Sequence, residues 1–369
     1  MEWVRGEAVG HGSFGTVYLG IRRRSDCTQI PQLMAVKSAL ISQSSSLQKE
    51  KQILTQLRDC PQILGCFGDD FTIENGQNFH NILLEYASRG SLADLLRNSG
   101  GPLPEFDIRR YTKSILKGLV YIHENGYVHC DIKLQNILLC SSSSSDSGND
   151  VKIADFGLAK KMGQRENGVF SLTGTPLYMS PESVADNEQE APSDIWSLGC
   201  AVSEMGAGKP AWRCRPDSDV SALLFRIGFG DELPEIPGEL SEQGRDFLRR
   251  CFVRDPTKRW TAKMLLNHPF ITDSTVSLSE TDKPSPSPSP SPRSAFDFPD
   301  WSSTGSFFSN SAQSSPSTES YNCFEGEFHR PDSSPADRIR KLVTGKQPNR
   351  FSSDRWVTVR EAESPVSQS

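Results

Sequence analysis

Three short motifs between residues 129 and 182 constrain this chain more than any other feature of its sequence. They follow one another in a fixed order and combine acidic, amide and basic side chains. Any one of them could occur by chance in a chain of 369 residues. The ordered set requires a fold that brings distant segments to one site, and its members are His129–Asn136 (HCDIKLQN), Asp155–Gly157 (DFG) and Ser180–Glu182 (SPE).

These motifs supply the groups that phosphoryl transfer needs. The reaction requires a carboxylate to orient the acceptor hydroxyl, ligands for Mg²⁺, and cations that neutralise the phosphates. Asp131 fits the first of these functions and Lys133 fits the third. Asn136 and Asp155 carry the hard oxygen atoms that Mg²⁺ prefers. The motifs therefore predict a site for Mg²⁺-dependent phosphoryl transfer.

A glycine-rich segment near the N-terminus fits a cover over nucleotide phosphates. Residues 10–17 read GHGSFGTV, and β-forming residues follow Gly15. Glycines permit a tight turn whose backbone N–H groups approach phosphate oxygens closely. Because a dinucleotide-binding fold would continue into a helix, the strand-like continuation favours a strand–loop–strand hairpin over ATP. From this stretch alone, a plain glycine-rich hairpin remains the alternative.

Lys37 and Glu50 form a predicted ion pair upstream of these motifs. Lys37 ends the strand-like segment MAVK, and a cation there could bind the α- and β-phosphates. Glu50 has apolar residues three positions before it and three and four positions after it, so it faces inward on an amphipathic helix. An inward glutamate is costly unless it is paired, and Lys37 is the natural partner. Taken alone, Glu50 could also be exposed.

Taken together, these motifs resemble those of the eukaryotic protein kinases, over about residues 3–271. The resemblance implies an α+β fold with two lobes: a β-rich N-lobe with one helix to about Leu84, and a helical C-lobe to about Ile271. It implies that ATP and Mg²⁺ bind between the lobes. Asp131, Lys133 and Lys37 would be catalytic, and Asn136 and Asp155 would bind the metal.

The same resemblance implies a set of ATP-binding residues. Leu84 would be the gatekeeper, Glu85 and Ala87 would offer backbone groups to adenine, and Val17, Ala35 and Leu138 would enclose the ring. The full set is Gly10, His11, Gly12, Ser13, Phe14, Gly15, Val17, Ala35, Lys37, Glu50, Leu84, Glu85, Ala87 and Leu138.

Further residues indicate the class of kinase. Lys133 with Thr175 is typical of Ser/Thr kinases, Asp194 would brace the catalytic loop, and Arg259 would pair with Glu182. The segments 1–6, 174–182 and 265–270 and the His-Cys-Asp loop are similar to plant MEKK-like MAP kinase kinase kinases. That likeness implies that the substrates are MAP kinase kinases in stress and hormone signalling.

Cys130 departs from the family pattern. Most kinases regulated through the activation loop have an arginine there, which binds the loop phosphate, and a thiol cannot bind a dianion. Ser171 and Thr173 remain candidate phosphorylation sites, but we expect an active conformation without a loop phosphate. Cys130 is interpreted as a small buried residue, with a redox sensor as the alternative. A zinc site with His123 and His129 lacks a fourth ligand.

The composition changes at Thr272. The 97 residues from Asp273 contain 11 of the 24 prolines, and residues 272–369 are predicted to be a flexible, largely disordered regulatory tail. Seven Ser-Pro steps there could receive feedback from proline-directed kinases, although a plain linker is the alternative. Residues 338–343 resemble a docking motif. They could instead pack on the main domain together with residues 356–359.

Composition excludes several other classes of protein. A net charge of −6 argues against a protein that binds nucleic acid, and no apolar run is long enough to cross a bilayer. Nine scattered cysteines are typical of reduced thiols. We expect a soluble protein in the cytoplasm, with the nucleus left open as a second location. The rival functions are a kinase-fold scaffold without catalysis and a kinase of lipids or small molecules.

Overall fold

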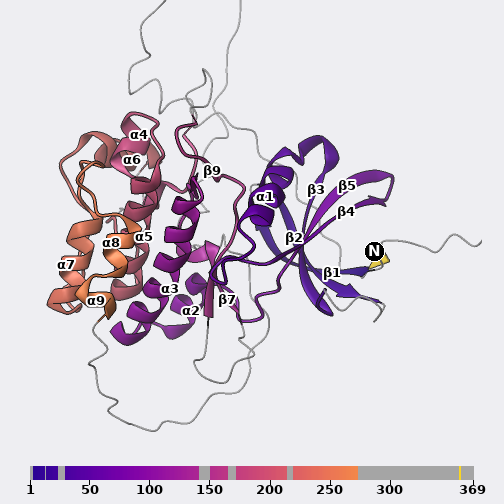
Figure 1. Ribbon diagram of the computed structural model, residues 1–369, viewed down its shortest axis with the longest axis horizontal. Helices are drawn as coiled ribbons and strands as arrows, with labels where there is room; N and C mark the ends of the chain where they lie inside the picture. The colour runs from indigo at the N-terminus through magenta and orange to yellow at the C-terminus, as the bar shows by residue number, and fades with distance from the viewer. Residues whose placement is uncertain are drawn as a thin grey trace, which may run out of the picture.

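The computed structural model describes residues 3–12, 14–23, 30–140, 150–164, 172–213, 219–272 and 357–358. Within these residues the chain forms a β-rich N-terminal lobe and a helical C-terminal lobe (Figure 1). The predicted two-lobed α+β fold is therefore confirmed. None of the helices described is long and apolar enough to cross a membrane.

The N-terminal lobe is an antiparallel sheet with the strand order β10-β1-β2-β3-β5-β4. The predicted glycine-rich segment connects β1 to β2, so it forms the expected strand–loop–strand hairpin. A single α-helix, α1 (Ser45–Gln56), packs on β3, β4 and β5. The first five strands are β1 (Trp3–Gly12), β2 (Gly15–Arg22), β3 (Leu33–Leu40), β4 (Cys66–Glu74) and β5 (Gln77–Leu84).

The sixth strand of this sheet comes from the far end of the sequence. In β10 (Val357–Thr358), Val357 lies opposite Arg5 and Thr358 opposite Val4 in an antiparallel pair. The prediction that residues 356–359 contact the main domain is thus confirmed for two residues. The other predictions for the tail, including its Ser-Pro sites and residues 338–343, lie outside the described residues.

The C-terminal lobe is mainly helical, with two small antiparallel sheets that pair β6 with β9 and β7 with β8. The serine-rich residues 141–149 connect β7 to β8 and lie outside the described residues. The helices are α2 (Leu92–Ser99), α3 (Glu105–Glu124), α4 (Pro181–Ala185), α5 (Ala191–Ala207), α6 (Val220–Phe229), α7 (Glu242–Cys251), α8 (Ala262–Leu266) and α9 (Pro269–Thr272). The short strands are β6 (Tyr127–Val128), β7 (Ile137–Cys140), β8 (Asp150–Ile153) and β9 (Lys160–Lys161).

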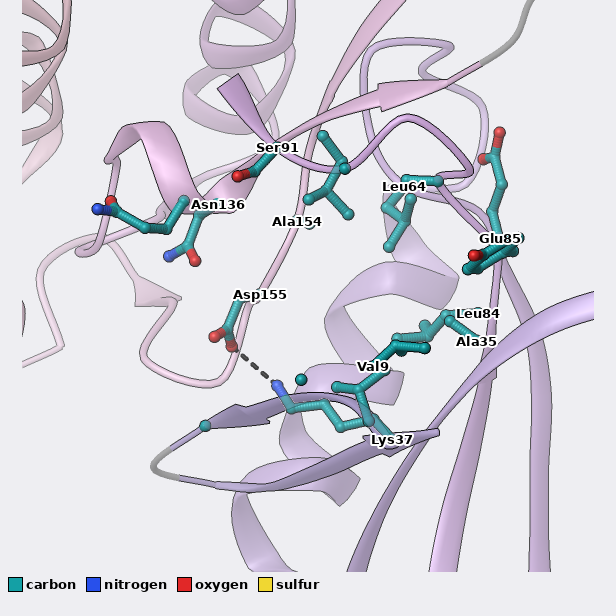
Figure 2. A pocket seen from close by; sticks show the side chains of 18 of the residues that line it. Val9, Ala35, Lys37, Leu64, Leu84, Glu85, Ser91, Asn136, Ala154 and Asp155 are labelled. Atoms are coloured by element: carbon teal, nitrogen blue, oxygen red, sulfur yellow. Dashed lines mark hydrogen bonds and ion pairs between the residues drawn. The ribbon is translucent and has the colours of Figure 1, made fainter. Parts of the chain in front are cut away.

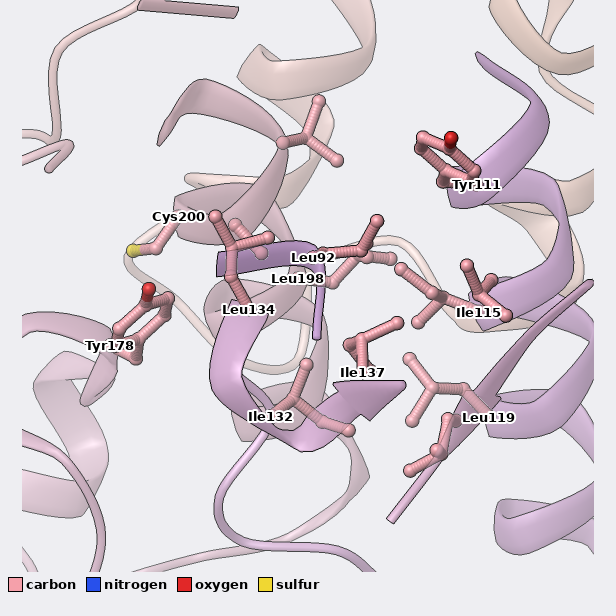
Figure 3. Packing of buried hydrophobic residues seen from close by; sticks show 14 of the residues in the cluster. Leu92, Tyr111, Ile115, Leu119, Ile132, Leu134, Ile137, Tyr178, Leu198 and Cys200 are labelled. Atoms are coloured by element: carbon pink, nitrogen blue, oxygen red, sulfur yellow. The ribbon is translucent and has the colours of Figure 1, made fainter. Parts of the chain in front are cut away.

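The core of this lobe holds the segment that carries the predicted catalytic residues (Figure 3). Ile132 and Leu134 are fully buried in the main hydrophobic cluster. Burial of each such side chain contributes about 1.5–3 kcal/mol. Because these residues alternate with Asp131 and Lys133, the polar side chains are held at the edge of the core. Around them pack Leu92, Ile115, Leu119, Ile137 and Leu198.

Helix α5 is the central helix of the C-terminal lobe. Its residues 193–206 are buried except for Ser197, as expected for a helix that is apolar on most sides. The end of helix α7 packs closely on α5 at Gly199. A Cβ added to Gly199 would lie 2.7 Å from the Cβ of Cys251 and 2.7 Å from the Phe252 ring. Only glycine permits this contact between the two helices.

We expect Gly199→Ala to destabilise the protein. Overpacking in a core costs about 1–3 kcal/mol, and the better helix propensity of alanine offsets about 1 kcal/mol of this. The net cost of up to about 2 kcal/mol should lower the melting temperature, measured by scanning calorimetry, by up to roughly 8 °C. As a control, Gly101→Ala adds a Cβ with no heavy atom within 4 Å and should leave the melting temperature almost unchanged. Equal melting temperatures for both variants would contradict this account of the contact between α5 and α7.

Candidate active site

The predicted nucleotide-binding residues meet in a cleft between the two lobes, shown from close by in Figure 2. The β1–β2 hairpin contributes one wall, and the segments after β5 and around β7 contribute others. The predicted residues that line this cleft are Gly10, His11, Gly12, Gly15, Val17, Ala35, Lys37, Glu50, Leu84, Glu85, Ala87, Lys133, Asn136, Leu138 and Asp155.

Two of the described predicted residues, Phe14 and Asp131, do not line this cleft directly. Phe14 packs on Gly157, where an added Cβ would meet the ring at 2.7 Å, and its ring centroid lies 6.0 Å from Lys37 Nζ. Asp131 lines a second, smaller hollow together with Thr175. Ser13 lies outside the described residues. The cleft is thus built mainly, but not entirely, from the residues that the sequence indicated.

Lys37 joins the two lobes through two carboxylates. Its Nζ lies 2.7 Å from Glu50 Oε2 on α1 and 2.9 Å from Asp155 Oδ1 in the C-terminal lobe. The predicted Lys37–Glu50 pair is therefore confirmed. Burial would lower the pKa of Lys37, but the two carboxylates outweigh it and raise this pKa above its ordinary value. Lys37 is thus held as a cation at the cleft wall.

Only one oxygen of the Asp155 carboxylate, Oδ1, takes part in the ion pair with Lys37. Burial would raise the pKa of Asp155, but the attraction and hydrogen bond of Lys37 keep it below the ordinary value. Glu50 is in turn fixed by the backbone N–H of Phe156, which donates to Glu50 Oε1 over 3.2 Å. The Asp155 carboxylate is thus ionised. It is oriented by Lys37 from the N-terminal lobe and by the N–H of Gly157 from the C-terminal lobe.

Asp131 lies in a network with three other polar side chains. Thr175 Oγ1 donates to Asp131 Oδ1 over 2.7 Å, and Asn136 Nδ2 donates to Asp131 Oδ2 over 3.0 Å. Lys133 Nζ lies 2.8 Å from Asp131 Oδ2 and 2.8 Å from Thr175 Oγ1. Lys133 and Thr175, the two residues typical of Ser/Thr kinases, are thus in direct contact. The network fixes both oxygens of the carboxylate.

Asn136 and Asp155 have the chemistry of a Mg²⁺ site. Both line the cleft, and among the described residues neither Asn136 Oδ1 nor Asp155 Oδ2 accepts a hydrogen bond. Mg²⁺ is typically bound by one or two protein oxygens, with phosphate and water oxygens as its other ligands. Accordingly, the described residues contain no cluster of three or more His, Cys, Asp or Glu side chains suited to a metal. The pair of oxygens fits Mg²⁺ bound together with a phosphate.

Asp194 on α5 supports the catalytic loop from behind. It accepts hydrogen bonds from the backbone N–H groups of His129 (2.9 Å) and Cys130 (3.0 Å) and contacts His123 Nε2 at 2.9 Å. Burial would raise the pKa of Asp194, but the hydrogen bonds from His123 and the backbone keep it low. The other predicted brace, Arg259 to Glu182, is also present, with contacts of 2.6 and 3.0 Å.

The surroundings of Cys130 favour a structural function for its thiol. Its backbone has a positive φ of 68°, and its Sγ contacts the carbonyl of Val128 at 3.7 Å. Burial raises the pKa of the Cys130 thiol well above its ordinary value. Reactive cysteines have a lowered pKa, so the redox-sensor alternative loses its support. The zinc alternative also fails, because His123 and His129 are bound to Asp194 and to the carbonyl of Ala154.

The sequence did not indicate every residue of the cleft. Val9, Leu64 and Ala154 add apolar surface, and nothing in their local sequence marks them. Asp94 and Gln135 add polar groups at the cleft wall. The Asp94 position carried one local signal, because it closes a capping box at the start of α2. Gln135 Oε1 is buried without a partner among the described residues, a feature visible only in three dimensions.

Comparison with known proteins supports the same conclusion as this geometry. Residues 3–271 match the protein kinase domain family. Mitogen-activated protein kinase kinase kinase 20 of Arabidopsis thaliana is 46% identical over 98% of this chain and 100% of its own length. Mitogen-activated protein kinase kinase kinase 17 of the same plant is 42% identical over 74% of this chain and 70% of its own length. Mitogen-activated protein kinase kinase kinase A of Dictyostelium discoideum is 34% identical over 73% of this chain.

A kinase domain match over most of the chain, together with a relative aligned along its full length, establishes the family. The chain belongs to the protein kinases, as a Ser/Thr kinase of the plant MEKK-like MAP kinase kinase kinase type.

Proposed function

We propose that this kinase transfers the γ-phosphate of ATP, with Mg²⁺, to Ser or Thr hydroxyls of MAP kinase kinases. The observation that carries the proposal is the network of Asp131, Asn136, Lys133 and Thr175 beside the Lys37–Asp155 ion pair. It gathers a carboxylate, two cations and two free oxygen ligands at one end of the cleft.

Each group has a distinct function in the proposed reaction. Asp131 orients the acceptor hydroxyl and accepts its proton, while Lys133 lies 2.8 Å from Asp131, where it can neutralise the transferred phosphoryl group. Lys37 binds the α- and β-phosphates as a fixed cation. Asn136 and Asp155 would hold Mg²⁺, which would neutralise negative charge on the phosphates during transfer. Because all these groups are preorganised, little rearrangement accompanies the transfer.

In this proposal the adenine ring binds between the apolar residues of the cleft. Val17, Ala35 and Leu138 provide apolar surface for its two faces. The carboxylate of Glu85 is already bound by Lys152 Nζ at 2.7 Å and by the N–H of Gly65 at 3.1 Å. The backbone N–H of Glu85 also donates to the carbonyl of Gly65, over 2.8 Å. This leaves the carbonyl of Glu85 and the N–H of Ala87 to recognise the adenine edge.

The proposed substrate class rests on the names of the relatives. Proteins similar to this chain are named MAP kinase kinase kinases, and the Arabidopsis relative aligns along the full length of both chains. We place the substrate among MAP kinase kinases, the protein in the cytoplasm or nucleus, and its function in stress signalling. Feedback through Ser-Pro sites of the tail is part of the same proposal.

Transfer of labelled phosphate from ATP to a kinase-inactive MAP kinase kinase tests this function. We expect labelling of Ser or Thr in that substrate and weaker labelling of a generic peptide. No transfer to either would favour a kinase-fold scaffold, which the complete set of Lys37, Asp131, Asn136 and Asp155 argues against. Labelling of a lipid instead of a protein would contradict the proposed substrate class.

Asp131→Asn should abolish most phosphoryl transfer and leave ATP binding intact. The amide keeps the shape of the side chain but cannot accept the proton, a contribution of about 10²–10⁴-fold in rate. ATP affinity, measured by calorimetry, should stay within about twofold of wild type because Asp131 does not line the nucleotide cleft. The matched control is Asp107→Asn on the surface of α3, where the pair with Arg110 is partly exposed. A wild-type rate for Asp131→Asn would refute the assignment.

Glu50→Gln should weaken catalysis through Lys37. Glutamine removes the negative charge of the ion pair and so weakens the alignment of Lys37 Nζ on the phosphates, and misplacement of such a group costs roughly a hundredfold. We expect that loss in kcat/KM for ATP, measured by steady-state kinetics. Lys51→Gln is the control on the same helix, since its pair with Asp69 is partly exposed and is worth at most about 1 kcal/mol. Equal kinetics for the two variants would show that the Lys37–Glu50 pair does not matter for transfer.

A further inference from the structure

The activation segment is the stretch of chain between the motifs Asp155–Gly157 and Ser180–Glu182. The short loop between α4 and α5 holds it at Thr173, close to the catalytic network. Gln189 Nε2 donates to the carbonyl oxygen of Thr173 over 2.6 Å, and Thr173 Oγ1 donates to Gln189 Oε1 over 3.1 Å. The Gln189 side chain is buried, with 8% of its surface exposed. One neutral amide thus binds the backbone and the side chain of the same residue.

Glu190, the residue after Gln189, binds the activation segment at Gly163, on the other side of residues 165–171. Glu190 Oε1 accepts a hydrogen bond from the N–H of Gly163 over 3.1 Å and lies 3.9 Å from Lys160 Nζ. Gly163 and Thr173 stand on either side of residues 165–171, which lie outside the described part of the chain. Two consecutive residues, Gln189 and Glu190, therefore bind both described flanks of the activation segment.

This loop is itself fixed to the C-terminal lobe. The N–H of Glu188 donates to the carbonyl of Glu182 over 3.2 Å, and the hydroxyl of Ser193 donates to the carbonyl of Glu188 over 3.3 Å. Glu182 is bound by the buried guanidinium of Arg259 at 2.6 Å. The position of Gln189 is thus set by a buried ion pair and by backbone hydrogen bonds.

Thr173 is connected to the catalytic carboxylate through two residues. Gly174 has a φ of +109°, and a Cβ there would lie 3.0 Å from the carbonyl oxygen of Cys130. Thr175 follows and donates to Asp131. Because the chain passes this closely over Cys130, a displacement of Thr173 would move the Thr175 hydroxyl away from Asp131.

We propose that Gln189 is a positioning residue that aligns Thr175 with Asp131 and so allows phosphoryl transfer without a phosphate on the activation segment. The proposal rests on the proposed Ser/Thr kinase function. A phosphate anchor binds a dianion through cations, usually arginine, and Cys130 supplies none. The amide of Gln189 does the same positioning with two neutral hydrogen bonds.

The two hydrogen bonds between Gln189 and Thr173 form a neutral clamp, and the charges around Gln189 agree with it. The cavity beside Gln189 and Thr173 is lined by two lysines, Lys49 and Lys160, and three carboxylates, and Lys160 is already paired with Glu190. This surplus of negative charge disfavours a dianion bound there. The carboxylates are Asp186, Glu188 and Glu190.

The experiment compares the full chain, dephosphorylated by a phosphatase, with three variants on a kinase-inactive MAP kinase kinase. Gln189→Met keeps the size of the side chain and removes both hydrogen bonds, so kcat should fall by about tenfold or more. Thr173→Val removes only the hydroxyl donor and should lower kcat by about fivefold, whereas Thr173→Ser keeps the donor and should restore it. KM for ATP should stay unchanged in all three variants, and an unchanged melting temperature would exclude a smaller folded fraction as the cause of a lower kcat.

The control for the substitution itself is Gln52→Met on the exposed face of α1. Dephosphorylated wild-type protein should retain its transfer rate. Loss of that rate on phosphatase treatment, or wild-type kcat for both Gln189→Met and Thr173→Val, would overturn the proposal. If Gln189→Met does not fold, the comparison of kcat between Thr173→Val and Thr173→Ser tests the proposal by itself. Absence of transfer by every form, phosphorylated wild type included, would instead refute the proposed kinase function.

Discussion

The buried ammonium of Lys37 is the interaction on which the arrangement of the two lobes depends. It is 5% exposed, and a charge buried to that extent is tolerated only when it is paired and hydrogen-bonded. Its two partners come from α1 and from the C-terminal lobe, at 2.7 and 2.9 Å. The sheet, the helix and the catalytic lobe must therefore approach one another together, and the nucleotide cleft is the space that this approach leaves.

On the C-terminal side of the cleft, the hydrophobic core fixes the positions of the catalytic residues. Ile132 and Leu134 anchor the catalytic loop in the core (Figure 3). Lys133, between them, lines the cleft, and Asp131, just before them, lines the smaller hollow that it shares with Thr175. Asp194 then fixes the backbone of the same loop from α5. Side chains positioned by packing and by a second set of hydrogen bonds are what catalysis requires, so the stability of the C-terminal lobe and its chemistry depend on the same residues.

The sequence was sufficient for the parts of the site that follow from local chemistry. A glycine-rich turn, an inward glutamate that needs a cation, and ordered polar motifs each have a physical reason that can be read from neighbouring residues. Apolar cleft residues such as Leu64 could not be predicted, because apolar side chains are common and only tertiary packing selects those that line the cleft. The contact of Gln189 with Thr173 likewise joins two loops with no shared pattern.

The nature of the clamp on Thr173 determines where control of this kinase can act. A phosphate anchor can be added and removed, whereas the amide of Gln189 is always present, so the activation segment keeps its alignment once the chain has folded. Control then has to act on another element that catalysis needs. The Lys37–Glu50 pair is such an element, because it depends on how α1 sits on the sheet of the N-terminal lobe. That sheet is also where β10, from the far end of the sequence, pairs with β1. The two described residues of the tail thus contact the same lobe that holds the Lys37–Glu50 pair.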